Sequence, residues 1–248
     1  MVSGGGLVAK VGPAEVVARE AALLDTHLPL IVPMLVDAGP GWLVMTAEAD
    51  EDGPWTDDDL RAALSDLARL HDEVQLFSLD GADVLLRRPF SADGVDALLA
   101  PVRQLSVALP DVLADLLDDP TPIVEAAAAE PETVLHGDPW PGNVLRPAPG
   151  RRVWVDWEMA SLGPAAADIA SWLGQTRWHT GAPTDGHLEA YLAARSMPIV
   201  EARFERALDA ATVLWFLAYD VPHLAAGEAA ETLVRTAGAA AERLRATS

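Results

Sequence analysis

The sequence predicts an α+β protein of two lobes, a small β-rich N-terminal lobe and a large, mostly helical C-terminal lobe. Three observations carry this prediction. Apolar runs typical of strands gather near the N-terminus, helical periodicity dominates after residue 54, and one non-helical stretch, residues 134–162, interrupts the helices. The predicted lobes are residues 1–49 and 50–248, with a hinge near residues 46–54.

The N-terminal lobe is predicted to contain three strands and one helix. Residues 7–11 have the apolar composition of a short strand. A proline suited to the first turn of a helix then opens residues 13–28. Two β-rich runs follow, residues 28–37 and 41–48, separated by an Ala-Gly-Pro-Gly turn signal. The polar, acidic residues 49–54 end in Gly-Pro and are therefore the best candidate for the lobe boundary.

The C-terminal lobe begins with a strong helix signal. Thr56 can cap a helix over residues 57–74, whose first-turn aspartates suit the positive end of the helix dipole. Further helices are predicted near residues 92–104, 109–129, 164–177, 185–196, 199–219 and 225–246. The non-helical stretch holds two β-like runs, Val134–Asp138 and Arg152–Glu158, joined by a loop rich in proline and glycine.

Composition excludes several classes of function. A formal net charge of −21 argues against nucleic acid as a partner, because a phosphate backbone requires clustered Lys and Arg. The absence of cysteine excludes disulfides and thiolate metal sites. The chain has no apolar run long enough to span a membrane and no signal-peptide pattern at its start, so a soluble cytoplasmic protein is expected. The acidity either attracts a cationic substrate or keeps an Ala-rich chain in solution.

The polar residues of the non-helical stretch have the pattern that phosphoryl transfer needs. His136-Gly137-Asp138 is followed by Asn143, and Asp156 stands at the end of an apolar run. Phosphoryl transfer requires a carboxylate that orients the attacking hydroxyl and accepts its proton. It also requires hard oxygen ligands for Mg²⁺ and a cation against the nucleotide phosphates. Asp138 can supply the first carboxylate, and Asn143 with Asp156 can supply the oxygen ligands.

These residues resemble the motifs of a known family. Residues 136–143 match the pattern HGDxxxxN of the aminoglycoside phosphotransferase and choline kinase-like family, relatives of the protein kinases, at every fixed position. Asp156-Trp157-Glu158 is similar to the family's later D-W/F-E/D motif, and Gly163-Pro164 with the small residues up to Asp168 resembles the segment that follows it.

The resemblance implies a protein-kinase-like fold and a phosphotransferase activity. The implied reaction transfers the γ-phosphoryl group of ATP or GTP, with Mg²⁺, to a hydroxyl of a small molecule. Asp138 would be the catalytic base, and Asn143 and Asp156 would bind Mg²⁺. Asp168 would brace the loop, and His136 would support it through hydrogen bonds to nearby backbone.

The N-terminal lobe resembles the family's nucleotide-binding elements. Of the 17 basic residues, 16 are arginine, and the one lysine, Lys10, lies in the first predicted strand. Lys10 resembles the strand lysine that pairs with the nucleotide α- and β-phosphates, and Glu20 resembles the helix glutamate that holds that lysine. Met45 and Ala47 lie where the last strand and the hinge would meet the adenine. Glu158 is either a further metal ligand or an outward structural residue.

The start of the chain departs from the family pattern. Relatives place a strand pair with a glycine-rich loop well ahead of the lysine, whereas nine residues precede Lys10. The cluster Gly4–Gly6 is the candidate remnant of that loop, and the usual hairpin is not expected to fit. Two functions therefore stand side by side. One is an active kinase; the alternative is a non-catalytic small-molecule binding module of kinase-like fold that has lost the phosphate-covering hairpin.

The acceptor substrate is the least determined part of the prediction. Candidate contacts are aromatic and polar residues of the C-terminal helices, although such residues are also typical of a helical core: Trp178, His179, Trp215, Tyr219 and Asp220. An aminoglycoside or amino-sugar suits the acidic chain, and choline-like alcohols, sugars and macrolides remain open. No membrane partner is expected, and the oligomeric state is open.

Overall fold

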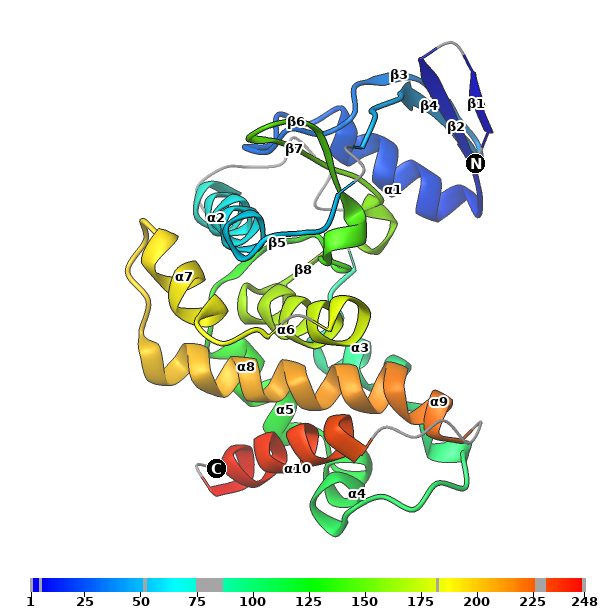
Figure 1. Ribbon diagram of the computed structural model, residues 1–248. Coiled ribbons are helices and arrows are strands. Elements are labelled where there is room, and N and C mark those ends of the chain that lie inside the picture. The colour runs from blue at the N-terminus through cyan, green and yellow to red at the C-terminus, as the bar shows by residue number, and fades with distance from the viewer. Residues whose placement is uncertain are drawn as a thin grey trace. The chain divides into compact units, whose positions relative to one another are not determined.

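The computed structural model describes residues 2–4, 6–50, 53–74, 87–181, 183–225 and 231–246 (Figure 1). Helices predominate among them and are accompanied by small sheets, which confirms the predicted α+β class. The chain forms two compact units. The first contains residues 1–86, 136–161 and 175–198, and the second contains residues 87–135, 162–174 and 199–248. The predicted lobe boundary after residue 49 stays a prediction.

The first unit contains a four-stranded sheet with the order β1-β2-β4-β3 (Figure 1). Its strands are β1 (Val2–Gly4), β2 (Leu7–Val11), β3 (Leu35–Gly39) and β4 (Trp42–Thr46). The predicted strand over residues 7–11 is confirmed, and Lys10 pairs with Leu43 of β4. A short strand that the sequence did not predict, β1, pairs antiparallel with β2. Gly6, at the turn between them, has φ +81°, a conformation that favours glycine.

The prediction of a strand over residues 28–37 was wrong in its first half. Helix α1 (Ala14–Leu24) ends before that run, and the next strand starts only at Leu35. Pro29 and Pro33 explain the difference, because proline has no N–H to donate to a sheet. Leu28 and Leu30 of this segment are buried, whereas Ile31 and Met34 are exposed, and the carbonyl of Ile31 accepts a hydrogen bond from the Trp154 N–H at 2.9 Å. Leu28 and Leu30 therefore belong to the core without forming a strand.

Besides α1, the α-helices described in the first unit are α2 (Asp57–Val74), α7 (His187–Ala194) and the last residues of α6 (Ala166–Thr180). The predicted cap of α2 is confirmed, because the Asp59 N–H donates to Thr56 Oγ1 at 3.2 Å and the Thr56 N–H donates back to Asp59 Oδ2 at 3.1 Å. Helix α2 packs against α7 (Figure 1). The hairpin of β6 (Val144–Ala148) and β7 (Arg151–Trp154) contacts α2, because Arg152 Nε donates to Asp66 Oδ2 at 2.6 Å.

Arg146 of β6 anchors the segment that the sequence predicts as hinge and boundary. Its N–H donates to Asp50 Oδ1 at 2.7 Å, and its guanidinium donates to the Gly53 carbonyl at 2.6 Å. The same guanidinium lies 4.5 Å from the centre of the Trp55 ring, in a cation–π contact. The chain that leaves β4 is thereby tied to the hairpin that precedes Asp156.

The second unit is mostly helical. It contains α3 (Ala92–Leu99), α4 (Asp111–Asp118), α5 (Thr121–Ala128), α8 (Glu201–Trp215), α9 (Val221–Ala225), α10 (Glu231–Ala246), a 3-10 turn (Val102–Gln104) and a π-helical turn η5 (Phe216–Asp220). The predicted helix over residues 109–129 is two helices, because Pro120 interrupts the run. Helix α8 packs against α5 and α10 around buried alanine and leucine side chains.

The two strands of a further sheet come before and after the segment that carries the predicted catalytic residues. Strand β5 (Glu132–Leu135) ends just before His136 and pairs with β8 (Ser161–Pro164). The two β-like runs seen in the sequence are therefore not partners of each other. Among the described helices, none combines the length and the hydropathy needed to cross a bilayer.

Candidate active site

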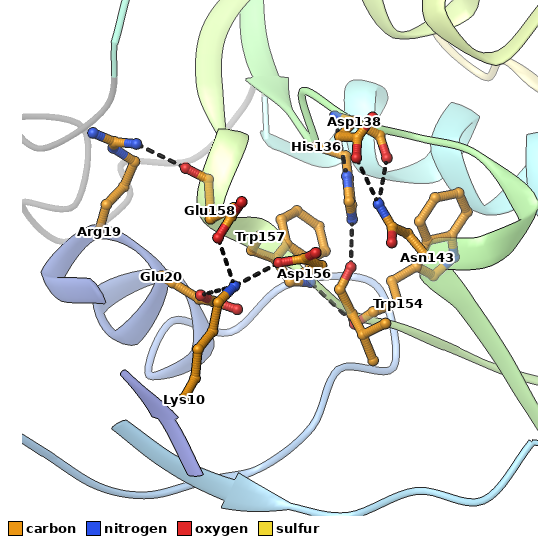
Figure 2. A network of polar contacts seen from close by, with 11 residues as sticks. Lys10, Arg19, Glu20, His136, Asp138, Asn143, Trp154, Asp156, Trp157 and Glu158 are labelled. Carbon is orange, nitrogen blue, oxygen red and sulfur yellow. Dashed lines mark hydrogen bonds and ion pairs between the residues drawn. The ribbon is translucent and has the colours of Figure 1, made fainter. Parts of the chain in front are cut away.

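The loop after β5 is held by a buried histidine. His136 has no exposed surface and packs against the rings of Trp154 and Trp157, at 5.4 and 4.6 Å between ring centres. Its Nε2 donates to the Val155 carbonyl at 2.9 Å, since a carbonyl oxygen can only accept (Figure 2). Nδ1 then accepts the Asp138 N–H at 3.4 Å. His136 thus connects the loop to the end of β7.

Gly137 is required by the close approach of two chain segments. Its φ is +85°, and a Cβ at this position would lie 2.1 Å from the carbonyl oxygen of Met159. A side chain cannot be placed there without moving the backbone. The glycine of the HGD motif therefore has a steric cause in this structure.

Asp138 and Asn143 are joined directly. Asn143 Nδ2 donates to the Asp138 carbonyl at 2.8 Å and to Asp138 Oδ2 at 3.0 Å (Figure 2). Because both bonds use the amide nitrogen, they determine which way the amide group faces, and its oxygen is turned away from Asp138. Asn143 is 7% exposed, and its carbonyl accepts the Val155 N–H at 3.0 Å. The loop is therefore hydrogen-bonded to the residue that precedes Asp156.

Asp156 occupies an unusual backbone conformation directly after β7. Its φ and ψ are 64° and 59°, and among the described residues it is the one non-glycine residue with positive φ. Left-handed conformations of this kind cost free energy and tend to occur at functional sites. The turn brings the Asp156 carboxylate to Lys10 Nζ, at 2.5 Å.

Lys10 lies within a group of three carboxylates. Its Nζ is 2.5 Å from Asp156 Oδ1, 2.8 Å from Glu20 Oε2 and 3.0 Å from Glu158 Oε2 (Figure 2). Partial burial opposes the charged form of Lys10, but the hydrogen bonds to Asp156 and Glu20 outweigh it and raise the Lys10 pKa. Burial raises the pKa of Glu20, and Lys10 opposes that shift. Three carboxylates around one ammonium leave an excess of negative charge that favours a further cation.

The donor set fits Mg²⁺ bound together with phosphates. No group of three or more His, Cys, Asp or Glu side chains in the described ranges is arranged to hold a metal by itself. Mg²⁺, however, is commonly held by one or two carboxylates plus substrate phosphates and water. The Asp156 carboxylate and the Asn143 amide oxygen are hard oxygen donors of this kind, on segments joined by the hydrogen bond from the Val155 N–H.

Three residues at this site were not singled out in the sequence. Arg19 of α1 is 4% exposed and donates to the Glu158 carbonyl at 2.8 Å. Gln175, on α6, donates from Nε2 to Asp138 Oδ1 at 2.6 Å. The Trp140 ring contacts that of His179 at a tilt of 37°, with 4.5 Å between ring centres, and a Cβ on Gly142 would lie 2.3 Å from the Trp140 ring. No sequence motif marks the contacts of Arg19, Gln175 and His179, because each joins a helix to a segment far away in the chain.

The other predicted site residues are spread over both units. In the first unit, Met45 is buried in β4, the Ala47 N–H donates to the Gly6 carbonyl at 2.8 Å, and Trp178 is 58% exposed. The second unit holds the buried Asp168 together with Trp215, Tyr219 and Asp220. The roles proposed for all of them stay predictions.

The aromatic residues of the second unit are part of its packing. Trp215 donates from Nε1 to the Ala167 carbonyl at 3.0 Å, and its ring contacts those of Phe90 and Tyr219. Asp220 ends the π-helical turn, and burial raises its pKa to about 6, an effect that His223 opposes.

Comparison with known proteins gives the fold and the family. A choline/ethanolamine kinase family protein from Mesorhizobium loti has a TM-score of 0.59 at 21% identity, with 98% of this chain and 82% of that chain covered. Amicoumacin kinase hAmiN, solved with AMP-PNP, Ca²⁺ and Ami, has a TM-score of 0.64 at 12% identity, with 98% and 82% covered. Aminoglycoside phosphotransferase APH(3'')-Id from Streptomyces rimosus, solved with ADP and streptomycin, has a TM-score of 0.54 at 19% identity, with 87% and 88% covered.

These likenesses confirm the kinase-like fold. No curated protein matches the chain. The phosphotransferase enzyme family, in contrast, matches residues 9–209, which include Lys10, the HGD loop and Asp156. Because this match covers most of the sequence, the chain belongs to the phosphotransferase enzyme family.

Proposed function

We propose that this protein is a small-molecule kinase that transfers the γ-phosphoryl group of ATP, with Mg²⁺, to a hydroxyl of its acceptor. One observation carries the proposal. The hydrogen bonds from Asn143 Nδ2 to Asp138 and from the Val155 N–H to Asn143 join the loop carboxylate to the strand that delivers Asp156. A candidate base and two candidate oxygen ligands thereby belong to one hydrogen-bonded assembly, as phosphoryl transfer requires.

Each residue has a proposed task that follows from its contacts. Asp138 would orient the acceptor hydroxyl and accept its proton as the O–P bond forms. Asn143 Oδ1 and the Asp156 carboxylate would hold Mg²⁺, which when bound offsets negative charge on the phosphates. Lys10 would contact the nucleotide phosphates, and Glu20 would hold the Lys10 ammonium in place.

The nucleotide would approach the strands around Lys10. The β1-β2 hairpin places glycine backbone ahead of the strand that carries Lys10. At the predicted hinge the Ala47 N–H already donates to the Gly6 carbonyl, so we propose that Ala47 meets the adenine through its carbonyl group. Met45, 5% exposed, would support this position from within the sheet rather than by direct hydrogen bonding.

The proposed acceptor class is a cationic amino-sugar or aminoglycoside. The net charge of −21 favours a cationic molecule over an anionic one. Solved proteins that share the fold were crystallised with gentamicin or streptomycin, which makes this class the first to be screened. Trp178, His179, Trp215, Tyr219 and Asp220 remain the proposed contact residues.

A thermal-shift titration with ATP and GTP, each with and without Mg²⁺, tests the proposal first. A ligand at 100 times its dissociation constant stabilises a fold by about 2.7 kcal/mol, enough for a clear shift. A Mg²⁺-dependent shift with ATP, followed by phosphorylation of an amine-bearing acceptor, is the expected result. No shift at millimolar nucleotide would contradict the proposal and favour the non-catalytic binding module.

A further inference from the structure

Both oxygens of the Asp138 carboxylate accept a hydrogen bond from a neutral amide. Oδ2 accepts from Asn143 Nδ2 at 3.0 Å, and Oδ1 accepts from Gln175 Nε2 at 2.6 Å. The two donors come from different parts of the fold, since Asn143 ends the turn Pro141–Asn143 of the loop itself and Gln175 lies on helix α6. The contact from Gln175 is the shorter of the two.

We propose that Gln175 is a positioning residue for Asp138, an inference that rests on the proposed function. The terminal torsion of an aspartate is broad, so one donor leaves the carboxylate free to rotate. Two donors on different oxygens, from a loop and from a helix, determine the plane of the carboxylate. The reacting oxygen of a base must be placed closely for proton transfer, and errors of about 1 Å can cost about 100-fold in rate.

The chemistry of Gln175 suits this role. A glutamine amide donates a hydrogen bond without placing a full positive charge beside Asp138, as an arginine or lysine would. Each carboxylate oxygen retains room for a second hydrogen bond, which is the place of the acceptor hydroxyl. Gln175 is half-buried and precedes the fully buried Thr176, so its backbone is held by the packing of α6. A donor on a helix is held more rigidly than one on a loop.

Three single variants measure the contribution of Gln175. Gln175→Met keeps a side chain of similar length and removes the two N–H groups of its amide. Gln175→Glu places a second carboxylate opposite Asp138. We expect kcat to fall about 10- to 100-fold in both, with the KM for ATP and the thermal midpoint nearly unchanged. The matched control is Gln104→Met, the same change at an exposed position of the second unit, which should leave kcat as it is.

A double-variant cycle shows whether Gln175 acts through Asp138. Adding Gln175→Met to Asp138→Asn should cause little further loss of single-turnover rate, because the base that Gln175 positions is already gone. An equal loss in both backgrounds would overturn the inference. Wild-type kcat in Gln175→Met, together with a large loss in Asp138→Asn, would also overturn the inference. The proposed function would not be affected by that result. Full activity in Asp138→Asn would instead reject Asp138 as the base, and absence of phosphoryl transfer by the wild type would reject the proposed function itself.

Discussion

Lys10 Nζ lies 2.5 Å from Asp156 Oδ1, although 146 positions separate the two residues in the chain. The same ammonium contacts Glu20 of α1 and Glu158 (Figure 2). Lys10 and Asp156 are therefore neighbours within the first unit, although they belong to two different sequence motifs. This ion pair connects the sheet that would receive the nucleotide to the segment that would hold Mg²⁺.

Lys10→Met should weaken ATP binding and also destabilise the protein. The substitution leaves Glu20, 1% exposed, without its counter-charge. Removing one partner of a buried ion pair costs roughly 3–5 kcal/mol, and we expect about 2 kcal/mol here because Lys10 is only partly buried. Urea unfolding at neutral pH measures the change. The double variant Lys10→Met/Glu20→Met should recover much of the stability but not the ATP affinity. Full ATP affinity in either the single or the double variant would contradict the proposed contact of Lys10 with the nucleotide phosphates.

Asp138→Asn should remove most turnover while leaving ATP affinity close to that of the wild type. The amide cannot accept the proton of the acceptor hydroxyl, and general base catalysis contributes about 100- to 10,000-fold. Steady-state kinetics with an acceptor that the wild type phosphorylates measure kcat, and a thermal-shift titration with ATP measures the nucleotide affinity. Comparable kcat in the variant would show that another group accepts the proton.

Two substitutions separate the backbone role of Asp156 from its proposed role as a Mg²⁺ ligand. Asparagine tolerates the left-handed conformation at φ 64°, whereas alanine there costs about 1 kcal/mol or more. Both variants lose the carboxylate, so both should require at least about tenfold more Mg²⁺ for ATP binding. Only Asp156→Ala should also show a clear extra loss in thermal stability. Unchanged Mg²⁺ dependence in Asp156→Asn would reject the ligand role.

We expect Asp220 to make the stability of the protein depend on pH. Burial raises its folded-state pKa to about 6, above the ordinary value near 4, so the folded protein favours the neutral acid. Its stabilising contribution is complete below about pH 4 and is lost as the pH rises through about 6. The shift corresponds to at most about 2–3 kcal/mol, and solvent screening of this partly exposed group reduces it to about 1–2 kcal/mol.

Urea unfolding of the wild type and Asp220→Asn from pH 4 to pH 7.5 tests this prediction. The asparagine variant should lose less stability than the wild type over that range, because its amide does not ionise. His223 opposes the shift of the Asp220 pKa, so His223→Gln is the matched control. Parallel curves for the wild type and Asp220→Asn would show that Asp220 does not titrate within the fold.

Local sequence signals predicted the elements that depend on local rules. The helix over residues 57–74 was correct to the residue, because its cap and its apolar periodicity both act within a few turns. The prolines at 29, 33 and 120 interrupt elements that the sequence predicted, since hydrophobicity alone did not distinguish an irregular segment from a strand, or two helices from one. Strand β1 was not predicted, because it consists of three residues whose pairing partner decides their conformation.

The sequence by itself predicted the family, which the family match confirms, because the HGD loop, Asn143 and Asp156 form a specific spacing within 21 residues, 136–156. The central residues that it predicted stay predictions. The tertiary structure alone decided which other residues reach them. Gln175 contacts Asp138 across 37 positions and Arg19 contacts the Glu158 carbonyl across 139. Such contacts arise from the packing of whole helices against a loop, and no local pattern encodes which side chain a distant helix presents.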